Sequence, residues 1–246
     1  MKKPKAIFNW SGGKDSSLCL HALKENNEYD ITALLTSVNE SYQRVSMHGV
    51  RVELLERQAQ SIGLPLKKLM LPEMPSMTVY DELLHQTWKE MKDQGIEYSI
   101  FGDIFLEDLR EYREKQLEKV QIKGVFPLWN KPTSYLIDRF IDLGFKAVLV
   151  CVNEKYLDKS FAGRNLDKDF LKDLPKNVDP CGENGEYHSF VYDGPIFQKP
   201  IPFTIGEVVY RNYQAPKESD KQDDTCFSRS PTNHDTGFWF CDLLEN

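Results

Sequence analysis

Six residues near the start of the chain have the types and the order of an anion-binding loop. The segment reads Ser11-Gly12-Gly13-Lys14-Asp15-Ser16. It follows an apolar, strand-like run and precedes a helical pattern. Two glycines let the backbone approach a ligand closely because they lack a Cβ. Free N–H groups at the start of a helix attract negative charge, and the helix dipole reinforces this. The segment therefore predicts a phosphate site to which the serines add hydroxyl donors and Lys14 adds a positive charge.

The spacing of this loop differs from that of the Walker A loop, which has four residues between its first glycine and its Gly-Lys pair. An ordinary strand-to-helix turn, capped by Asp15 or Ser16, is the alternative interpretation. Either residue alone would favour that alternative. Six residues in order at the end of the first predicted strand favour phosphate binding.

A second candidate site follows the strand-like run that starts at Tyr98. Gly102 and Asp103 fall at its carboxyl end. In open α/β sheets, ligands bind at that edge, next to the point where the strand order reverses. Asp103 could orient Mg²⁺ or a substrate there, and the alternative is a solvated aspartate in a turn. His48 follows the second predicted strand in a glycine-containing loop, where it either approaches the nucleotide or substrate or is simply solvated.

A third candidate site combines two carboxylates and a histidine within six residues. Glu183, Glu186 and His188 surround the flexible Asn184-Gly185 pair. Such a set suits metal binding or general acid–base catalysis, although an acidic turn between two strands has the same composition. Because these side chains are too polar to be buried without partners, we expect the stretch to face the phosphate loop from the carboxyl edge of the sheet.

The elements that must position these sites alternate between strand-like and helix-like runs. Alternation of this kind predicts a doubly wound α/β fold with a parallel sheet over residues 1–153. A smaller α+β region follows over 154–246, with a polar loop at 211–236. The helical patterns are Val79–Met91, with Thr78 and Asp81 as a capping box, Thr133–Leu143 and Asp167–Leu174. The expected strands of the first sheet are Lys5–Trp10, Ile31–Val38, Leu66–Leu71, Tyr98–Ile104, Gly124–Leu128 and Lys146–Val152.

Composition excludes several classes of protein. The net charge of −7 over 246 residues argues against a nucleic-acid partner. No apolar run is long enough to span a bilayer, and no secretory signal is evident, so we expect a cytoplasmic protein without a membrane partner. The five cysteines show no paired spacing, so neither a disulfide nor a structural zinc site is expected. Assembly as a homo-oligomer stays open.

The phosphate loop matches that of the ATP pyrophosphatase (adenine-nucleotide alpha hydrolase) superfamily. Over residues 5–200 the chain also resembles the diphthine–ammonia ligases. That resemblance is carried by the loop, Gln58-Ala59, Gly63-Leu64-Pro65, the Gly102 stretch through Leu128-Trp129, and Gly182–Phe190. The last stretch usually reads Gly-Glu-Gly-Gly-Glu-Tyr-Glu-Thr in those ligases. Asn184, His188 and Ser189 depart from it, which is typical of a divergent, bacterial branch whose substrate would differ from diphthine.

The resemblance implies a HUP-type fold and an amide-forming reaction. ATP would bind through residues 11–16 with Gly102 and Asp103, and Mg²⁺ would lie near Asp15. A substrate carboxylate would be adenylated with release of pyrophosphate, and ammonia or an amine would then displace AMP. The implied catalytic residues are Lys14, Asp15, Glu183, Glu186 and His188. The implied substrate contacts are His48, Asn184 and Gly185.

Proteins with three other functions have the same kind of phosphate loop. A tRNA-modifying enzyme of the same superfamily usually adds paired cysteines or a basic RNA-binding domain, and neither is evident. An amidotransferase synthetase would carry or recruit a glutaminase, and no such nucleophile motif is present. A non-catalytic adenine-nucleotide-binding protein is distinguished from the enzymes only by the absence of ATP turnover.

Overall fold

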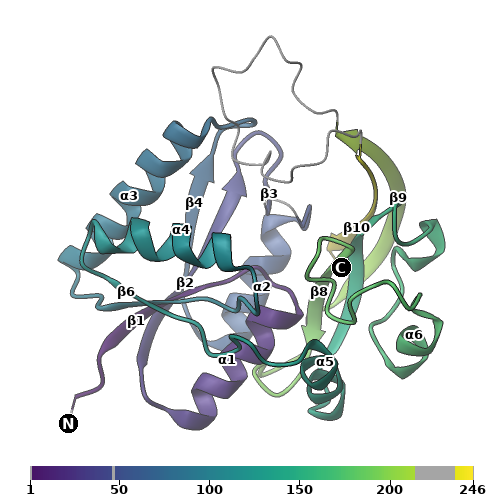
Figure 1. The fold of residues 1–246 in the computed structure, drawn as a ribbon, viewed down its shortest axis with the longest axis horizontal. Helices are drawn as coiled ribbons and strands as arrows, with labels where there is room; N and C mark the ends of the chain where they lie inside the picture. Colours follow the sequence, from purple (N-terminus) through teal and green to yellow (C-terminus); the bar gives the residue numbers. More distant parts are fainter. Residues whose placement is uncertain (1, 46–47, 214–235, 246) are drawn as a thin grey trace.

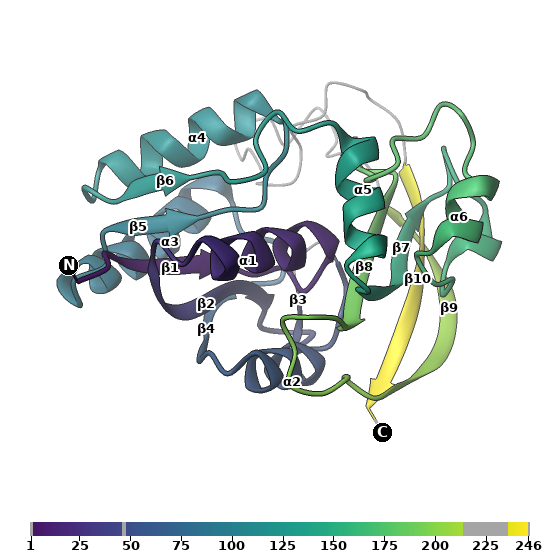
Figure 2. The same cartoon turned by 90° about the horizontal axis from the view of Figure 1, so that it is seen from below.

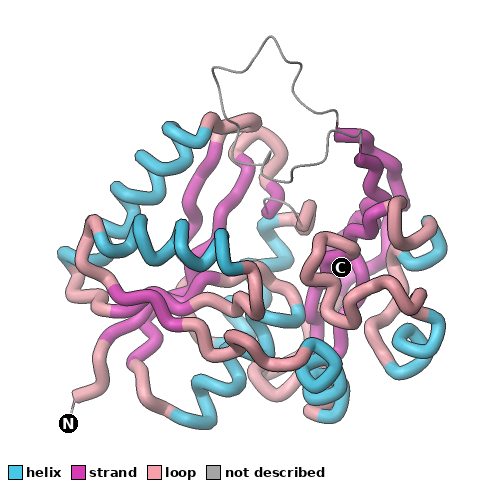
Figure 3. Tube along the Cα trace, in the orientation of Figure 1, coloured by secondary structure: helices cyan, strands magenta, loops and turns pink. Residues whose placement is uncertain are grey.

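The computed structural model describes residues 2–45, 48–213 and 236–245. Its strands form two sheets, one mainly parallel and one antiparallel, which lie side by side (Figure 1). Figure 3 shows the strands gathered into these two groups, with the longer helices around the first. The candidate site residues are distributed over both.

The first sheet has a parallel core in the order β4-β2-β1-β5-β6, and the short β3 pairs antiparallel with the end of β2. After β4 the chain crosses to the other side of β1, so the strand order reverses between β1 and β5. This is the switch point at which open sheets bind ligands. The strands are β1 (Lys5–Asn9), β2 (Asp30–Asn39), β3 (Arg44–Val45), β4 (Leu66–Leu71), β5 (Tyr98–Ile100) and β6 (Lys123–Val125).

Helices cover both faces of this sheet, as a doubly wound fold requires. One core cluster joins α1 and α2 to the sheet, and a second joins α3 and α4 to its other face. The capping box expected at Thr78 and Asp81 is wrong, because the N-cap of α3 is Ser76, whose hydroxyl accepts from Val79 N at 3.2 Å. The helices are α1 (Lys14–Asn26), α2 (Val52–Ile62), α3 (Met77–Asp93) and α4 (Glu107–Glu118).

The second sheet is antiparallel, in the order β8-β7-β10-β9. Its β7 is the strand that we expected to extend the parallel sheet, and this expectation is wrong. Nearly all of β7 is buried, because its side chains belong to the hydrophobic core, and it lies in the middle of its sheet, between β8 and β10. A strand buried on both faces has the same continuous apolar sequence in either kind of sheet. The strands are β7 (Lys146–Asn153), β8 (Tyr187–Asp193), β9 (Phe203–Tyr213) and β10 (Thr236–Glu245).

The change from one sheet to the other therefore falls between β6 and β7, earlier than the expected division at residue 153. The helix α5 (Thr133–Asp142) lies at this junction in both views (Figure 1, Figure 2). A single buried cluster contains residues of β1, α1, α5, β7 and β8, so the two sheets share one hydrophobic core. The short η1 (Lys159–Phe161) and α6 (Lys168–Asp173) follow β7.

The expected doubly wound fold with a parallel sheet, followed by a smaller region of strands and helices, is confirmed. Of the polar loop expected at 211–236, residues 211–213 and 236 belong to β9 and β10. The remaining residues, 214–235, lie outside the described part of the chain.

Candidate active site

The phosphate loop, residues 11–16, joins β1 to α1 at the switch point. Gly12 has a φ of +79°, in the left-handed region that favours glycine, and Gly13 is the extended N-cap of α1. Hydroxyl groups brace the turn, since Ser16 Oγ and Ser17 Oγ donate to Gly13 O at 3.0 and 2.9 Å. The sequence therefore folds locally into the strand, turn and helix that an anion site needs.

Gly102 packs directly against this loop. A Cβ at Gly102 would lie 3.1 Å from Asp15 O and Ser16 N, closer than neighbouring groups usually allow. Asp103 forms an ion pair with Arg113 of α4 at 2.7 Å. Burial raises the pKa of Asp103, although Arg113 opposes the shift. The end of β5 thus packs against the phosphate loop. The Asp103 carboxylate is paired with Arg113.

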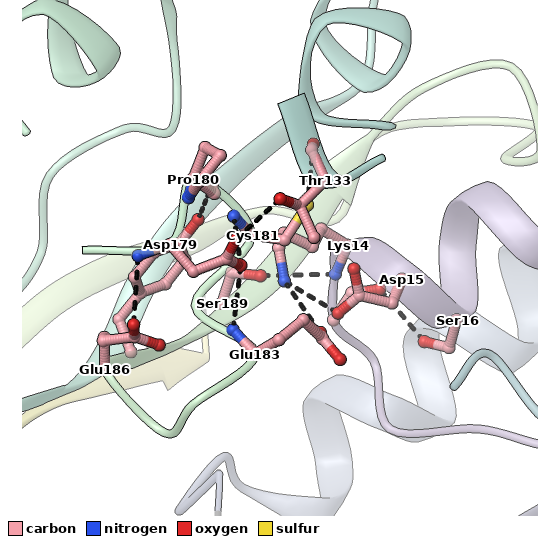
Figure 4. Close-up of polar contacts among 12 residues, drawn as sticks. Lys14, Asp15, Ser16, Thr133, Asp179, Pro180, Cys181, Glu183, Glu186 and Ser189 are labelled. Atoms are coloured by element: carbon pink, nitrogen blue, oxygen red, sulfur yellow. Dashed lines mark hydrogen bonds and ion pairs between the residues drawn. The ribbon is translucent and has the colours of Figure 1, made fainter. Parts of the chain in front are cut away.

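The acidic turn, residues 179–186, reaches the phosphate loop from the second region. Lys14 Nζ lies 2.7 Å from Asp15 Oδ2 and 4.0 Å from Glu183 Oε1 (Figure 4). Beyond the turn, Ser189 of β8 accepts a hydrogen bond from Lys14 N at 3.2 Å. The expected proximity of the two segments is observed, and a carboxylate from the second region lies beside the cation of the first.

The charges of Lys14, Asp15 and Glu183 shift one another's pKa values. Burial disfavours the Lys14 ammonium, but the charge of Asp15, followed by smaller contributions from Tyr187, Cys181 and Glu183, outweighs burial and raises the pKa of Lys14 well above the usual range. Burial raises the pKa of Asp15 as well, and Lys14 only partly offsets this. Burial, followed by the charge of Asp15, raises the pKa of Glu183 to about 8. Glu183 can therefore exchange a proton near neutral pH.

The structure differs from the role expected for Glu186. Its buried carboxylate accepts hydrogen bonds from Asp179 N at 3.0 Å, Asn184 N at 2.8 Å and Asn184 Nδ2 at 3.1 Å. Figure 4 shows Glu186 on the side of the turn away from Lys14. The carboxylate is held by the turn itself and is not presented to a substrate. Asn184 folds back onto it, and neither Asn184 nor Gly185 has a contact with the phosphate loop among the bonds of the described residues.

The structure brings His48 and His188 together, but burial makes both of them weak bases. The rings of His48 and His188 stack with centroids 4.5 Å apart. Burial, and then the charge of Lys14, lowers the pKa of His188 to about 4, and burial lowers the pKa of His48 well below its ordinary value. A base this weak does not suit the catalytic role that the resemblance implies for His188. His48 packs close to Gly13, since a Cβ there would lie 3.3 Å from its Cε1.

Three residues that hold the site together were not among the candidates. Asp179 accepts from Thr133 Oγ1 at 2.6 Å and from Cys181 N at 3.0 Å, which shapes the acidic turn. Ser189 bonds to Lys14 N, and Gln58 of α2 bonds to both the loop and β8. Gln58 and Ser189 lie in stretches that carry the family resemblance, and Gln58 has a second signal because it is a polar residue on the apolar face of a helix.

Metal-binding residues are sparse in the part of the chain that the structure describes. No group of three His, Cys, Asp or Glu side chains there could hold a metal ion. Asp15 and Glu183 both lie beside Lys14 in the site. Mg²⁺ that arrives with phosphates needs only one or two carboxylates from the protein, and these two would fit that requirement.

Two further expectations concern cysteines and membranes. Cys19, Cys151, Cys181 and Cys241 are free and buried, and Cys226 lies outside the described residues. Among the helices of residues 2–45, 48–213 and 236–245, none is long and apolar enough to cross a bilayer.

Comparison with known proteins agrees with the arrangement of two regions. The diphthamide synthase N-terminal domain matches residues 4–124, and the diphthamide synthase C-terminal domain matches residues 132–216. The chain is 28% identical to a diphthine–ammonia ligase of Danio rerio, over 83% of this chain and 88% of that protein. It is 27% identical to the diphthine–ammonia ligase of Homo sapiens, over 71% of this chain and 69% of that protein.

Among solved structures, a predicted subunit of tRNA methyltransferase from Methanocaldococcus jannaschii is 17% identical, with a TM-score of 0.39. The match covers 58% of this chain and 77% of that one. The two domain matches together span the phosphate loop, β5 and the acidic turn, which are the segments that meet in the candidate site. The chain therefore belongs to the diphthine–ammonia ligase family.

Proposed function

We propose that this chain is an ATP-dependent ligase that forms an amide from a carboxylate and ammonia or an amine. In the first step, a substrate carboxylate oxygen bonds to the α-phosphorus of ATP, and the bond to pyrophosphate breaks. In the second step, the nitrogen attacks the acyl carbon, AMP leaves, and the nitrogen gives up a proton. The names of the relatives support this reaction, since they specify diphthine and ammonia.

The phosphate loop would stabilise the charge that develops in the first step. The amides at the start of α1 and the Lys14 ammonium are in place before the reaction, which is the condition for electrostatic catalysis. The hydroxyl groups of Ser11 and Ser16 would turn from their bonds within the loop to the phosphates when ATP binds. Mg²⁺ that arrives with ATP would be held by Asp15 or Glu183 together with phosphate oxygens, and would neutralise charge on the leaving pyrophosphate.

Glu183 would serve the second step. Its carboxyl lies 4.0 Å from Lys14 Nζ, and this one contact carries the proposal because it joins the acidic turn to the phosphate cradle. With a pKa of about 8, the ionised form can accept a proton from the attacking amine. We assign this role to Glu183 and not to Glu186 or His188. The Glu186 carboxylate is held by backbone amides, and His188 is too weak a base.

Nucleotide product analysis tests this function. The protein is incubated with ATP, Mg²⁺ and ammonium, first with a diphthine-bearing protein and then with pools of small carboxylates. AMP and pyrophosphate as products that require both the carboxylate and ammonium support the proposal. ADP and phosphate as the main products contradict it. AMP formation that requires tRNA instead of ammonium would favour a tRNA-modifying enzyme, and binding of ATP without turnover would indicate a nucleotide-binding protein.

A further inference from the structure

Gln58 is a fully buried polar side chain on α2, with 0% of its surface exposed. Its Nε2 donates to Gly12 O at 3.0 Å and to Val191 O at 2.6 Å, and its Oε1 accepts from Trp10 Nε1 at 2.9 Å. A buried amide is tolerated when its hydrogen bonds are made. The side chain thus joins three parts of the molecule: α2, the phosphate loop with the residue before it, and β8.

The loop and β8 are also bonded directly to each other. Val191 N donates to Gly12 O at 2.9 Å, and Lys14 N donates to Ser189 Oγ at 3.2 Å. Since β8 pairs with β7 along its other side, the edge that it presents to the loop is the free edge of the second sheet. The carbonyl of Gly12 therefore receives one donor from β8 and one from Gln58.

The conformation of Gly12 depends on this contact. A Cβ on Gly12 would lie 2.8 Å from Gln58 Oε1, so the glutamine packs directly against the glycine. The left-handed φ of +79° at Gly12 determines where the next amides of the loop point. In an anion site, the direction of those amides decides how well they bind phosphate.

We infer that Gln58 is a positioning residue for nucleotide binding, which holds Gly12 against β8 so that phosphate binding depends on the docking of the second sheet. This inference rests on the proposed function, because it takes ATP to be the ligand of the loop. A residue that served only the core would affect folding without linking the loop to β8.

The test compares Gln58→Met with Gln60→Met. Methionine has a similar length but cannot donate these hydrogen bonds, and Gln60 is an exposed residue of the same helix. ATP affinity is measured by calorimetry well below the unfolding temperature of each variant. We expect Gln58→Met to weaken ATP binding by about tenfold or more, the scale for a lost hydrogen bond to a loop that binds a charged group. We expect Gln60→Met to bind as the unsubstituted protein does.

Hydrogen exchange in the unsubstituted protein gives a second measurement that does not depend on how the variants fold. We expect ATP to slow exchange at the phosphate loop and also at the Val191 amide, which donates to Gly12 O. In Gln58→Met, or in Gln58→Glu if the methionine variant does not fold, the effect of ATP on Val191 should be lost.

Two results would overturn the inference while leaving the proposed function intact. One is wild-type ATP affinity in folded Gln58→Met. The other is protection of the loop by ATP without any change at Val191. If the unsubstituted protein does not bind ATP at all, the proposed function itself fails, and the calorimetry separates that case from the other two.

Discussion

The phosphate loop and the acidic turn are both glycine-containing polar segments, yet they satisfy their polar groups in different ways. The loop braces itself through serine hydroxyl groups and carries the ammonium of Lys14. The turn uses two of its carboxylates, Asp179 and Glu186, as acceptors for its own backbone amides. Of the turn's side chains, Glu183 is the one whose carboxylate pairs with Lys14.

This difference separates residues that look alike in the sequence. Glu183 and Glu186 are three positions apart and of the same type, but backbone N–H groups take up one carboxylate and leave the other beside a cation. A carboxylate that accepts hydrogen bonds from its own turn stabilises that turn. A carboxyl group that lies beside a charged side chain of the site is still able to bind a ligand or exchange a proton. The predictions below test whether that division holds.

The largest effect should follow Lys14→Met. The change removes the ammonium that balances Asp15 and Glu183. Loss of one donor to developing charge typically costs about 100-fold to 1,000-fold in turnover. Breaking a buried ion pair also lowers the free energy of unfolding, by about 3–5 kcal/mol. We expect pyrophosphate release to fall at least about 100-fold in protein that circular dichroism shows to be folded.

Lys115→Met is the matched control. Lys115 is an exposed residue of α4 that pairs with Glu111 at 3.2 Å, and surface pairs contribute about 0–1 kcal/mol. It should leave both turnover and stability unchanged. Turnover of Lys14→Met close to that of the control would show that the loop does not depend on this cation.

The pair Glu183→Gln and Glu186→Gln tests the division within the turn directly. Glu183→Gln should reduce amide formation by about 100-fold or more, the scale of a lost acid–base group, with little change in ATP affinity. Glu186→Gln should instead lower the free energy of unfolding by about 1–3 kcal/mol, because an amide nitrogen would face backbone donors. Single-turnover kinetics and urea unfolding of both variants measure these effects. The opposite pattern, with Glu186 essential for turnover, would reverse our assignment.

A further effect concerns the pH dependence of the free energy of unfolding. Because the pKa of Glu183 is raised from 4.5 to about 8, the folded protein retains a proton on this carboxyl that the unfolded chain releases. The contribution of Glu183 to the free energy of unfolding should therefore be complete below pH 4.5, and it should decline as pH rises towards 8. Glu183→Gln stays uncharged, so its free energy of unfolding should decline less over this range.

Urea unfolding of the unsubstituted protein and Glu183→Gln at several values between pH 5 and 8 measures this difference. The raised pKa values of Asp15 and Asp103 and the lowered values of His48 and His188 also act on stability, but they are present in both proteins. Parallel curves for the two proteins would contradict the raised pKa of Glu183.

Much of the fold could be predicted from hydrophobic pattern. The bounds of β4 are those expected, and α5 begins at the expected Thr133 after Pro132. The error at β7 has a physical cause, because an apolar run shows that a strand is buried on both faces but not which strands pair with it. Pairing partners lie far away in the chain, and the sequence pattern of one strand does not identify them.

The sequence by itself determined the candidate phosphate loop, since glycines, hydroxyl groups and a lysine that suit an anion are consecutive and need only a strand before them and a helix after them. It also determined which segment would supply the acids of the site. Only the tertiary structure decided what each acid does, because the acceptors of Glu186 are filled by amides of its own turn while Glu183 meets Lys14 from 169 positions away. The role of Gln58 was likewise decided by tertiary contacts, since its three partners belong to segments that meet only after both sheets have formed.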